Sequence, residues 1–193
     1  PAVCDEIAGR SEFLTVYDGE WYSSLGRFQT LFEFQSMIGE LVGMDVVGFP
    51  TYDWGASAGN AIRMAARITG RSEVLIPKTI SPQRLSIIRN FCQPTVMPSH
   101  IDVTLTEYQA DTGLLDIDDL KRKISSKTAA VYFENPSYLG AIEYQGQDIS
   151  GIAHEKGAMS IVGVDPISLG VLAPPADYGA DIVCGDAQPL GIH

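Results

Sequence analysis

Short apolar runs and amphipathic stretches alternate along most of this chain. The apolar runs have the length and composition of buried strands, and they span residues 74–77, 129–133, 159–164 and 179–184. The stretches between them carry apolar residues at helical spacing, and they span residues 81–92, 116–124 and 148–156. This alternation predicts an α/β fold with a mainly parallel sheet and helices on both faces.

Weaker patterns extend the sheet and add helices before it. Two further strand candidates are residues 95–98 and 103–108. They bring the expected sheet to about six or seven strands. Two further helices are expected at residues 5–13 and 58–69. Residues 25–41 repeat apolar side chains at helical spacing, which predicts a helix with a buried stripe that ends at Gly43.

Polar residues follow three of the predicted strands within a few positions. Asn135 comes after the strand at 129–133, Asp165 after the next, and Gln188 after the last. The carboxyl ends of parallel strands meet at one edge of a sheet, where ligands of open α/β folds bind. We therefore take these three residues as site candidates. The alternative is structural, because Asp165 can cap a turn and Asn135 with Pro136 can form one.

Small residues mark the start of the helix expected at residues 58–69. Gly55, Ala56 and Ser57 precede it, in a segment of polar and small side chains. Small side chains let a ligand approach the unpaired N–H groups of a helix start, where the helix dipole favours an anion such as a phosphate. The same residues also permit close packing between helices, and the pattern does not separate the two interpretations.

Composition narrows the function classes. The chain has 13 Lys and Arg against 24 Asp and Glu, a formal net charge of −11, which argues against a nucleic-acid partner. Its 193 residues and 45% hydrophobic content suit one globular domain over residues 1–193. The absence of a membrane-length apolar run and of a signal peptide predicts a cytoplasmic protein. Three well-separated cysteines are expected to be reduced, and they are Cys4, Cys92 and Cys184.

Both ends suggest that the chain is a fragment of a longer subunit. It begins at Pro1 without an initiator methionine, and it stops at His193, shortly after a predicted strand.

The order of these strand ends resembles the large domain of type I pyridoxal-phosphate enzymes. Several segments are more specific, and they resemble subunit 1 of glycine dehydrogenase (decarboxylating), which is also the N-terminal half of the glycine cleavage P-protein. These segments, which together reach along nearly the whole chain, are residues 10–15, 31–35, 43–46, 164–172, 179–188 and 190–191. The segment at 18–23 departs from the family pattern, with only Ser24, Gly26 and Arg27 retained after it.

The resemblance implies a fold, a cofactor and a reaction. In this family glycine condenses with pyridoxal phosphate and loses CO2, and the aminomethyl group passes to the lipoyl arm of H-protein. A helix start holds the phosphate and an Asp after a strand pairs with the pyridine nitrogen. The corresponding cofactor-binding candidates here are Gly55, Ala56, Ser57, Asn135, Asp165 and Gln188.

One departure from the family changes the expected role. The catalytic half carries a His-Lys pair after the last strand, and its lysine forms the Schiff base. Gln188 and Pro189 stand at that place here, and proline has no amine. We therefore expect a non-catalytic half whose partners are subunit 2, which carries the lysine, and H-protein. No catalytic residue and no metal ligand is predicted.

Two other functions stay open at this stage. One is a free-standing binding module with a degenerate pyridoxal-phosphate pocket, and the other is a dinucleotide-binding enzyme, which the absence of Gly-x-Gly-x-x-Gly after a strand disfavours. If the chain belongs to a larger assembly, an apolar face should be exposed around Trp21, Tyr22, Phe28 and Phe32, and the isolated chain should dimerise or aggregate.

Overall fold

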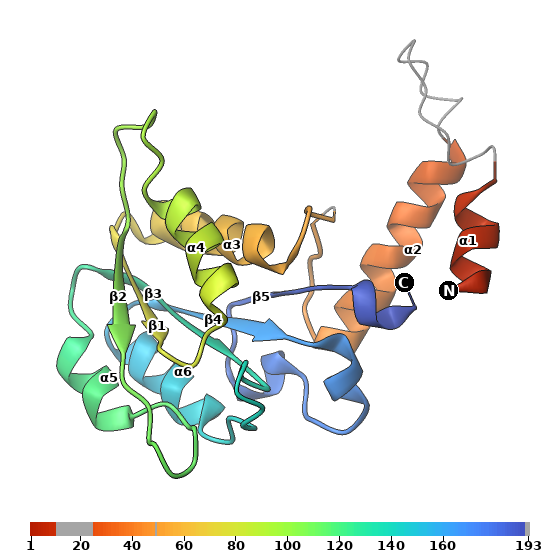
Figure 1. Cartoon of the computed structure of the whole chain (residues 1–193). Coiled ribbons are helices and arrows are strands. Elements are labelled where there is room, and N and C mark those ends of the chain that lie inside the picture. Colours follow the sequence, from red (N-terminus) through yellow and green to blue (C-terminus); the bar gives the residue numbers. More distant parts are fainter. Residues whose placement is uncertain (11–24, 49, 192–193) are drawn as a thin grey trace.

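A parallel sheet of five strands forms the centre of the described structure (Figure 1). The computed structural model describes residues 1–10, 25–48 and 50–191. The strand order is β2-β1-β3-β4-β5. In chain order the strands are β1 (Glu73–Pro77), β2 (Asp102–Thr106), β3 (Thr128–Glu134), β4 (Met159–Val164) and β5 (Ile182–Gly185). The α/β class and the parallel sheet are therefore confirmed.

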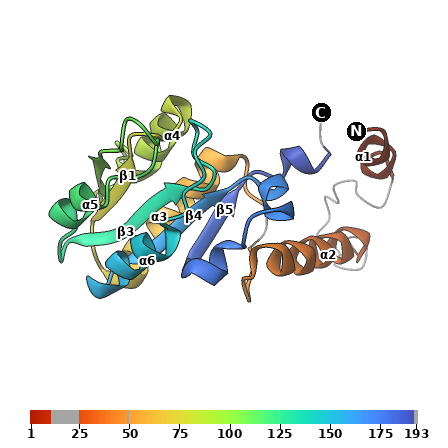
Figure 2. The same cartoon turned by 90° about the horizontal axis from the view of Figure 1, so that it is seen from below.

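Helices cover both faces of this sheet, as predicted (Figure 2). One face packs against α3 (Trp54–Thr69) and α4 (Pro82–Cys92), whose apolar residues share a core with Val74, Tyr132 and Ile161. The other face packs against α5 (Ile117–Lys123) and α6 (Gly146–Glu155). Because β3 lies between two strands and under both layers, all seven of its residues are buried.

The expectation of six or seven strands is wrong for the described residues. Residues 95–98 form a turn, in which the Met97 N–H donates to the Pro94 carbonyl oxygen at 3.2 Å. The apolar Val96 that suggested a strand is 90% exposed. Pro94 precedes the segment and Pro98 ends it, and proline supplies no N–H to a strand ladder.

The path of the chain creates one topological switch point at the carboxyl edge. From β1 the chain moves outward to β2 through α4, and it then returns across β1 to β3 through α5 on the opposite face. The direction of winding therefore reverses between β1 and β3. In open α/β sheets, ligands bind at such a reversal, beside the carboxyl ends of the two strands.

The N-terminal helices stand beside the sheet rather than on it (Figures 1 and 2). They are α1 (Ala2–Ala8) and α2 (Leu25–Val42). The helix expected at 5–13 is confirmed for residues 5–8, whereas residues 11–13 lie outside the described residues. The helix at 25–41 and its end at Gly43, with φ +73°, are confirmed. The prediction that this helix carries a buried stripe is wrong, because Phe28 and Phe32 are 51% and 63% exposed. Their exposure confirms part of the expected apolar face, whereas Trp21 and Tyr22 lie outside the described residues.

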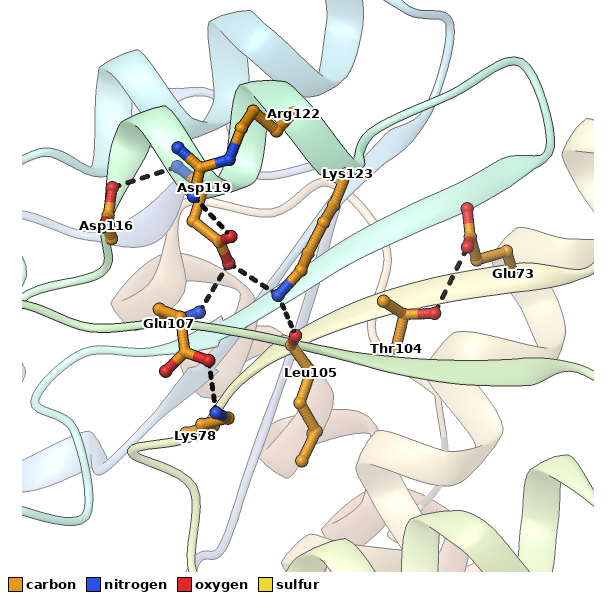
Figure 3. A network of polar contacts seen from close by, with 9 residues as sticks. All are labelled: Glu73, Lys78, Thr104, Leu105, Glu107, Asp116, Asp119, Arg122 and Lys123. Atoms are coloured by element: carbon orange, nitrogen blue, oxygen red, sulfur yellow. Dashed lines mark hydrogen bonds and ion pairs between the residues drawn. The ribbon is translucent and has the colours of Figure 1, made fainter.

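Asp119 ties the first turn of α5 to the end of β2 (Figure 3). Its carboxylate accepts from the Glu107 backbone N–H at 2.7 Å and from Lys123 and Arg122 at 2.8 Å each. Lys123 also donates to the carbonyl oxygen of Leu105 at 2.7 Å. Burial raises the pKa of Asp119, but these hydrogen bonds outweigh it and lower the pKa to about 2.

The cysteines are free thiols, and Cys92 and Cys184 are buried. Burial raises the pKa of Cys92 to about 11. No helix in the part of the chain described here combines the length and the apolar character needed to cross a membrane.

Candidate functional site

The three polar strand-end residues lie at one edge of the sheet. Asn135, Asp165 and Gln188 follow β3, β4 and β5, which are successive neighbours in the sheet. The Asn135 N–H donates to the carbonyl oxygen of Gly163 on β4 at 2.9 Å, so the pairing of β3 and β4 continues to this edge. The predicted meeting of the strand ends is confirmed, while the side chains have separate environments.

Asp165 caps the turn that follows β4. It is the N-cap of the 3-10 helix η3 (Pro166–Gly170), and its Oδ1 accepts from the Ile167 N–H at 3.0 Å. The Ser168 hydroxyl donates to the Asp165 carbonyl oxygen at 2.7 Å. This is the structural alternative that the sequence left open. A role of Asp165 in binding a cofactor stays a prediction.

Asn135 anchors the loop that follows β3. Its Oδ1 accepts from the Glu143 N–H at 3.1 Å, and its Nδ2 donates to the Glu143 carbonyl oxygen at 3.3 Å. Glu143 is buried too, and it accepts from the Leu115 N–H at 2.8 Å. Nδ2 also lies 3.5 Å from the hydroxyl of Tyr178, which packs with the core under α6. Both ends of the Asn135 amide are therefore engaged by protein groups.

The start of α3 lies earlier than predicted. The helix begins at Trp54 rather than at residue 58, so Gly55, Ala56 and Ser57 form its first turn. Asp53 is the N-cap, because a carboxylate at this position satisfies a free N–H, and it accepts from the Ala56 N–H at 2.7 Å. A ligand phosphate would have to compete with this negative charge for the same N–H.

Close packing between α3 and α4 explains the small residues of α3. A Cβ added to Gly55 would lie 2.8 Å from Cδ1 of Ile87, and one added to Gly59 would lie 2.5 Å from Cγ of Phe91. Both distances are shorter than real Cβ contacts allow. These glycines therefore serve the helix–helix contact, the second interpretation left open by the sequence.

Gln188 and Pro189 lie in the last described helical turn, η5 (Gln188–Leu190). The Gln188 N–H donates to Oδ1 of Asp186 at 2.9 Å, and the residue is exposed. Pro189 is exposed as well, and its match to the lysine of the catalytic half stays a prediction.

A buried polar cluster that sequence reasoning missed lies between these elements. Trp54 Nε1 donates to the Tyr132 hydroxyl at 3.2 Å, and that hydroxyl donates to Oε1 of Glu134 at 2.8 Å. Arg84 donates from Nη2 to Oε2 of Glu134 at 2.9 Å, and its guanidinium lies 4.1 Å from the centre of the Trp54 ring. Tyr138 lies on this guanidinium at 5.9 Å. Three elements thus converge, namely the starts of α3 and α4 and the end of β3.

Burial dominates the electrostatics of this cluster. The Glu134 side chain is 2% exposed, and its burial raises its pKa although Arg84 and the Tyr132 hydroxyl act in the opposite direction. Burial also raises the pKa values of Tyr132 and Cys184, and the Glu134 charge adds to both shifts. One signal for the cluster was present in the sequence, because Tyr132 and Glu134 are two apart in a strand and must share a face.

Two shallow hollows of the described surface lie between α2 and the loop after it and between α5 and α6. Neither includes a candidate residue. Among the described residues no group of three His, Cys, Asp or Glu side chains could hold a metal ion.

Known proteins resemble the whole chain. The family model described as glycine cleavage system P-protein matches residues 1–193. Probable glycine dehydrogenase (decarboxylating) subunit 1 of Staphylothermus marinus is 38% identical over all of this chain and 40% of its own length. The protein of the same name from Saccharolobus solfataricus is 41% identical over 96% of this chain and 40% of its own length. The chain thus spans about two fifths of these relatives.

Solved structures give the same result. An inhibitor-bound glycine decarboxylase (P-protein) of the glycine cleavage system superposes with a TM-score of 0.88 at 33% identity, over all of this chain and 42% of that one. An aromatic amino acid aminotransferase superposes over 97% of this chain and 49% of its own, with a TM-score of 0.65 at 17% identity. The second likeness is one of fold, and it confirms the type I pyridoxal-phosphate fold predicted from the strand ends.

Proposed function

Because this chain belongs to the glycine cleavage system P-protein family, we propose that it works as part of subunit 1 of glycine dehydrogenase (decarboxylating), as a non-catalytic half. In this proposal subunit 2 carries the lysine and the pyridoxal phosphate, and the two halves together form the site. When bound there, the cofactor supplies the electron sink for glycine decarboxylation. The aminomethyl group then passes to the lipoyl arm of H-protein, the second proposed partner.

The observation that carries this proposal is Pro189. It follows β5 at the sheet edge that Asp165 also borders, and its ring nitrogen belongs to the backbone and cannot attack a carbonyl group. Lys156, the nearest lysine before it, caps the C-terminus of α6 and is exposed. No described lysine therefore follows β5. Lys78 follows β1 at the same edge of the sheet, and it is paired with Glu107.

The remaining candidates also fit pyridoxal phosphate poorly. The Ala56 N–H already donates to a carboxylate, Gly55 packs on α4, and the Asn135 amide is engaged by Glu143. Asp165 uses one carboxylate oxygen, Oδ1, to accept from the Ile167 N–H. These contacts support a half that shapes the site and supplies no residue of its own to the chemistry.

The exposed face of α2 supports the proposed assembly with subunit 2. Phe28 and Phe32, one helical turn apart, are 51% and 63% exposed on a helix that stands beside the sheet (Figure 2). Apolar patches of this kind usually mark interfaces. An isolated helix of this length is marginal in water, so a partner surface would stabilise it.

Two measurements test the proposal. The chain is incubated with pyridoxal phosphate and reduced with borohydride, and we expect no lysine to gain the cofactor's mass stoichiometrically. CO2 release from glycine is then followed with the subunit alone, with subunit 2, and with subunit 2 and H-protein. We expect release only when subunit 2 is present. Stoichiometric labelling of one lysine, or CO2 release without subunit 2, would contradict a non-catalytic role.

A further inference from the structure

The crevice between the carboxyl ends of β1 and β3 is the place where an open α/β fold admits a ligand. Arg84 reaches into it from the first turn of α4, the helix that follows β1. Glu134, the last residue of β3, meets it from the other side at 2.9 Å. An ion pair of this chain's own residues thus joins the helix that follows β1 to the end of β3.

Trp54 fills the space beside this ion pair. Its ring lies against the Arg84 guanidinium at 4.1 Å, the separation of a cation–π contact. On the sheet side its Nε1 lies 2.9 Å from the place that a Cβ of Gly163 would take. Because Gly163 has no side chain, the indole and the Tyr132 hydroxyl can both lie directly on β4. A flat aromatic group is therefore already seated over the carboxyl ends of β3 and β4.

The bonds within the cluster are internal and hold its members together. The Trp54 N–H bonds to Tyr132, Tyr132 bonds to Glu134, and Glu134 bonds to Arg84. Arg84 and Glu134 have side chains that are 19% and 2% exposed. Such a chain of partly buried bonds is stable as a unit, and opening it would leave the buried Glu134 carboxylate without its partners.

From these contacts we infer that Trp54, Arg84 and Glu134 form a plug that occupies the ligand crevice of this domain. The plug excludes a planar phosphorylated ligand even when no covalent bond is required. This inference goes beyond the proposed function, which concerns the missing lysine. A half without a lysine could still hold the cofactor reversibly, and the plug removes that possibility.

Binding by the wild-type chain gives the first test. The probe is 4-deoxypyridoxine 5′-phosphate, which has the ring and phosphate of the cofactor but no aldehyde, so it cannot react with any lysine. We expect no saturable heat in calorimetry and no rise in Tm at probe concentrations up to about 1 mM. Saturable binding with a Kd below about 100 μM would overturn the plug and leave the proposed function intact, because that function depends on the lysine.

A cavity variant gives the second test. Trp54→Gly removes the indole from the plug, and a buried apolar space of that shape can take up a small aromatic molecule. We expect indole at about 1 mM to raise the Tm of this variant by several degrees and to leave the wild type unchanged. A folded Trp54→Gly chain whose Tm does not respond to indole would contradict a filled crevice at Trp54.

A third measurement stays informative if Trp54→Gly does not fold. The indole N–H of a plugged Trp54 should exchange with solvent slowly, because it is bonded to the buried Tyr132 hydroxyl. Arg84→Lys keeps the charge but loses the flat guanidinium, and we expect its Trp54 N–H to exchange at least 10-fold faster. Arg89→Ala, at an exposed arginine of the same helix, should leave the exchange unchanged. Fast exchange of the Trp54 N–H in the wild type would overturn the inference.

Discussion

Arg84 donates a hydrogen bond of 2.9 Å to Glu134, and this bond joins the start of α4 to the end of the most deeply buried strand. The pair is unequal in its exposure, because the Glu134 carboxylate is almost fully buried while part of Arg84 reaches solvent. Removing the arginine would therefore leave a buried carboxylate without its counter-charge. That asymmetry leads to a prediction that depends on pH.

We predict that Arg84→Ala destabilises the chain by about 3–5 kcal/mol at pH 8, because it leaves a buried charge unpaired. Burial already raises the pKa of Glu134 above 4.5, and losing Arg84 removes the main opposing effect. A carboxyl group whose folded pKa is raised contributes stability below its unfolded pKa and loses it as the pH rises through the folded pKa. The defect should therefore be small near pH 4.5 and grow toward pH 8.

Urea unfolding of Arg84→Ala at several pH values checks this dependence. The series runs from pH 4.5, which equals the ordinary pKa of a glutamate carboxyl group, to pH 8. The matched variant is Arg84→Ala/Glu134→Gln, which removes both charges. We expect it to recover part of the loss and to show no added pH dependence over the same range. An equal defect at both ends of the range for Arg84→Ala would argue against a buried, charged Glu134.

Asp119 should stabilise the chain with the opposite dependence on pH. Its folded pKa of about 2 lies below the ordinary 3.8, so its contribution is present above pH 3.8 and is lost as the pH falls through about 2. We predict that Asp119→Asn costs about 1–2 kcal/mol at pH 7, a value reduced by the solvent exposure of Lys123 and Arg122.

Acid titration of stability tests the Asp119 prediction. The wild type and Asp119→Asn should converge in free energy of unfolding as the pH is lowered from 4 toward 2. Asp118→Asn is the control, because Asp118 is exposed on the same helix as Asp119 (Figure 3). We expect this control to shift the free energy of unfolding by less than about 0.5 kcal/mol. Curves for Asp119→Asn and the wild type that stay parallel down to pH 2 would contradict the lowered pKa.

The strands and their edge could be predicted because they depend on local signals. The buried strands β1, β3 and β4 are visible in the sequence as runs of apolar residues. Parallel strands then bring Asn135 and Asp165 to one edge of the sheet, whatever the details of packing. The extra strand at 95–98 was predicted from apolar content alone. Pro94 before it and Pro98 at its end argue against a strand there.

The site chemistry could not be predicted because it depends on contacts between distant residues. Trp54 and Tyr132 are 78 positions apart, and Arg84 and Glu134 are 50 apart. The small residues at the start of α3 fit a phosphate and a neighbouring helix equally well in sequence. Only the position of Ile87 against Gly55 separates the two. The exposure of α2 was likewise hidden, because helical apolar spacing gives no information about whether the covering surface lies in the same chain.

We predict that Asn135→Ala lowers the free energy of unfolding by about 1–3 kcal/mol. The substitution leaves the buried N–H and carbonyl oxygen of Glu143 without their partner. The loop at 136–142 depends on this bond pair, so we also expect faster proteolysis there under native conditions. Denaturant unfolding and mapping of the first cleavage site measure both effects. Asn90→Ala, at an exposed asparagine of α4, is the control. Unchanged cleavage in Asn135→Ala would show that other contacts hold the loop.

The last prediction concerns the apolar face of α2 and the proposed partner. Phe28 and Phe32 are one helical turn apart and more than half exposed, so a surface that covers both would gain apolar burial from each. We predict that Phe28→Ser/Phe32→Ser weakens association with subunit 2 at least 10-fold in Kd. The free chain should lose little stability, because neither side chain is buried in it.

Ile68→Ser is the matched control for this pair. Ile68 is 62% exposed on α3, so its change removes a similar apolar surface from a helix that packs on the sheet. Analytical ultracentrifugation of subunit 1 with subunit 2 gives the Kd, and CO2 release from glycine in the same mixtures shows whether the loss of assembly removes activity. If α2 is the contact, the Phe28/Phe32 variant should recover activity at high subunit concentration, since association is the only step affected. A variant with unchanged Kd, or a control that weakens association equally, would place the interface elsewhere on subunit 1.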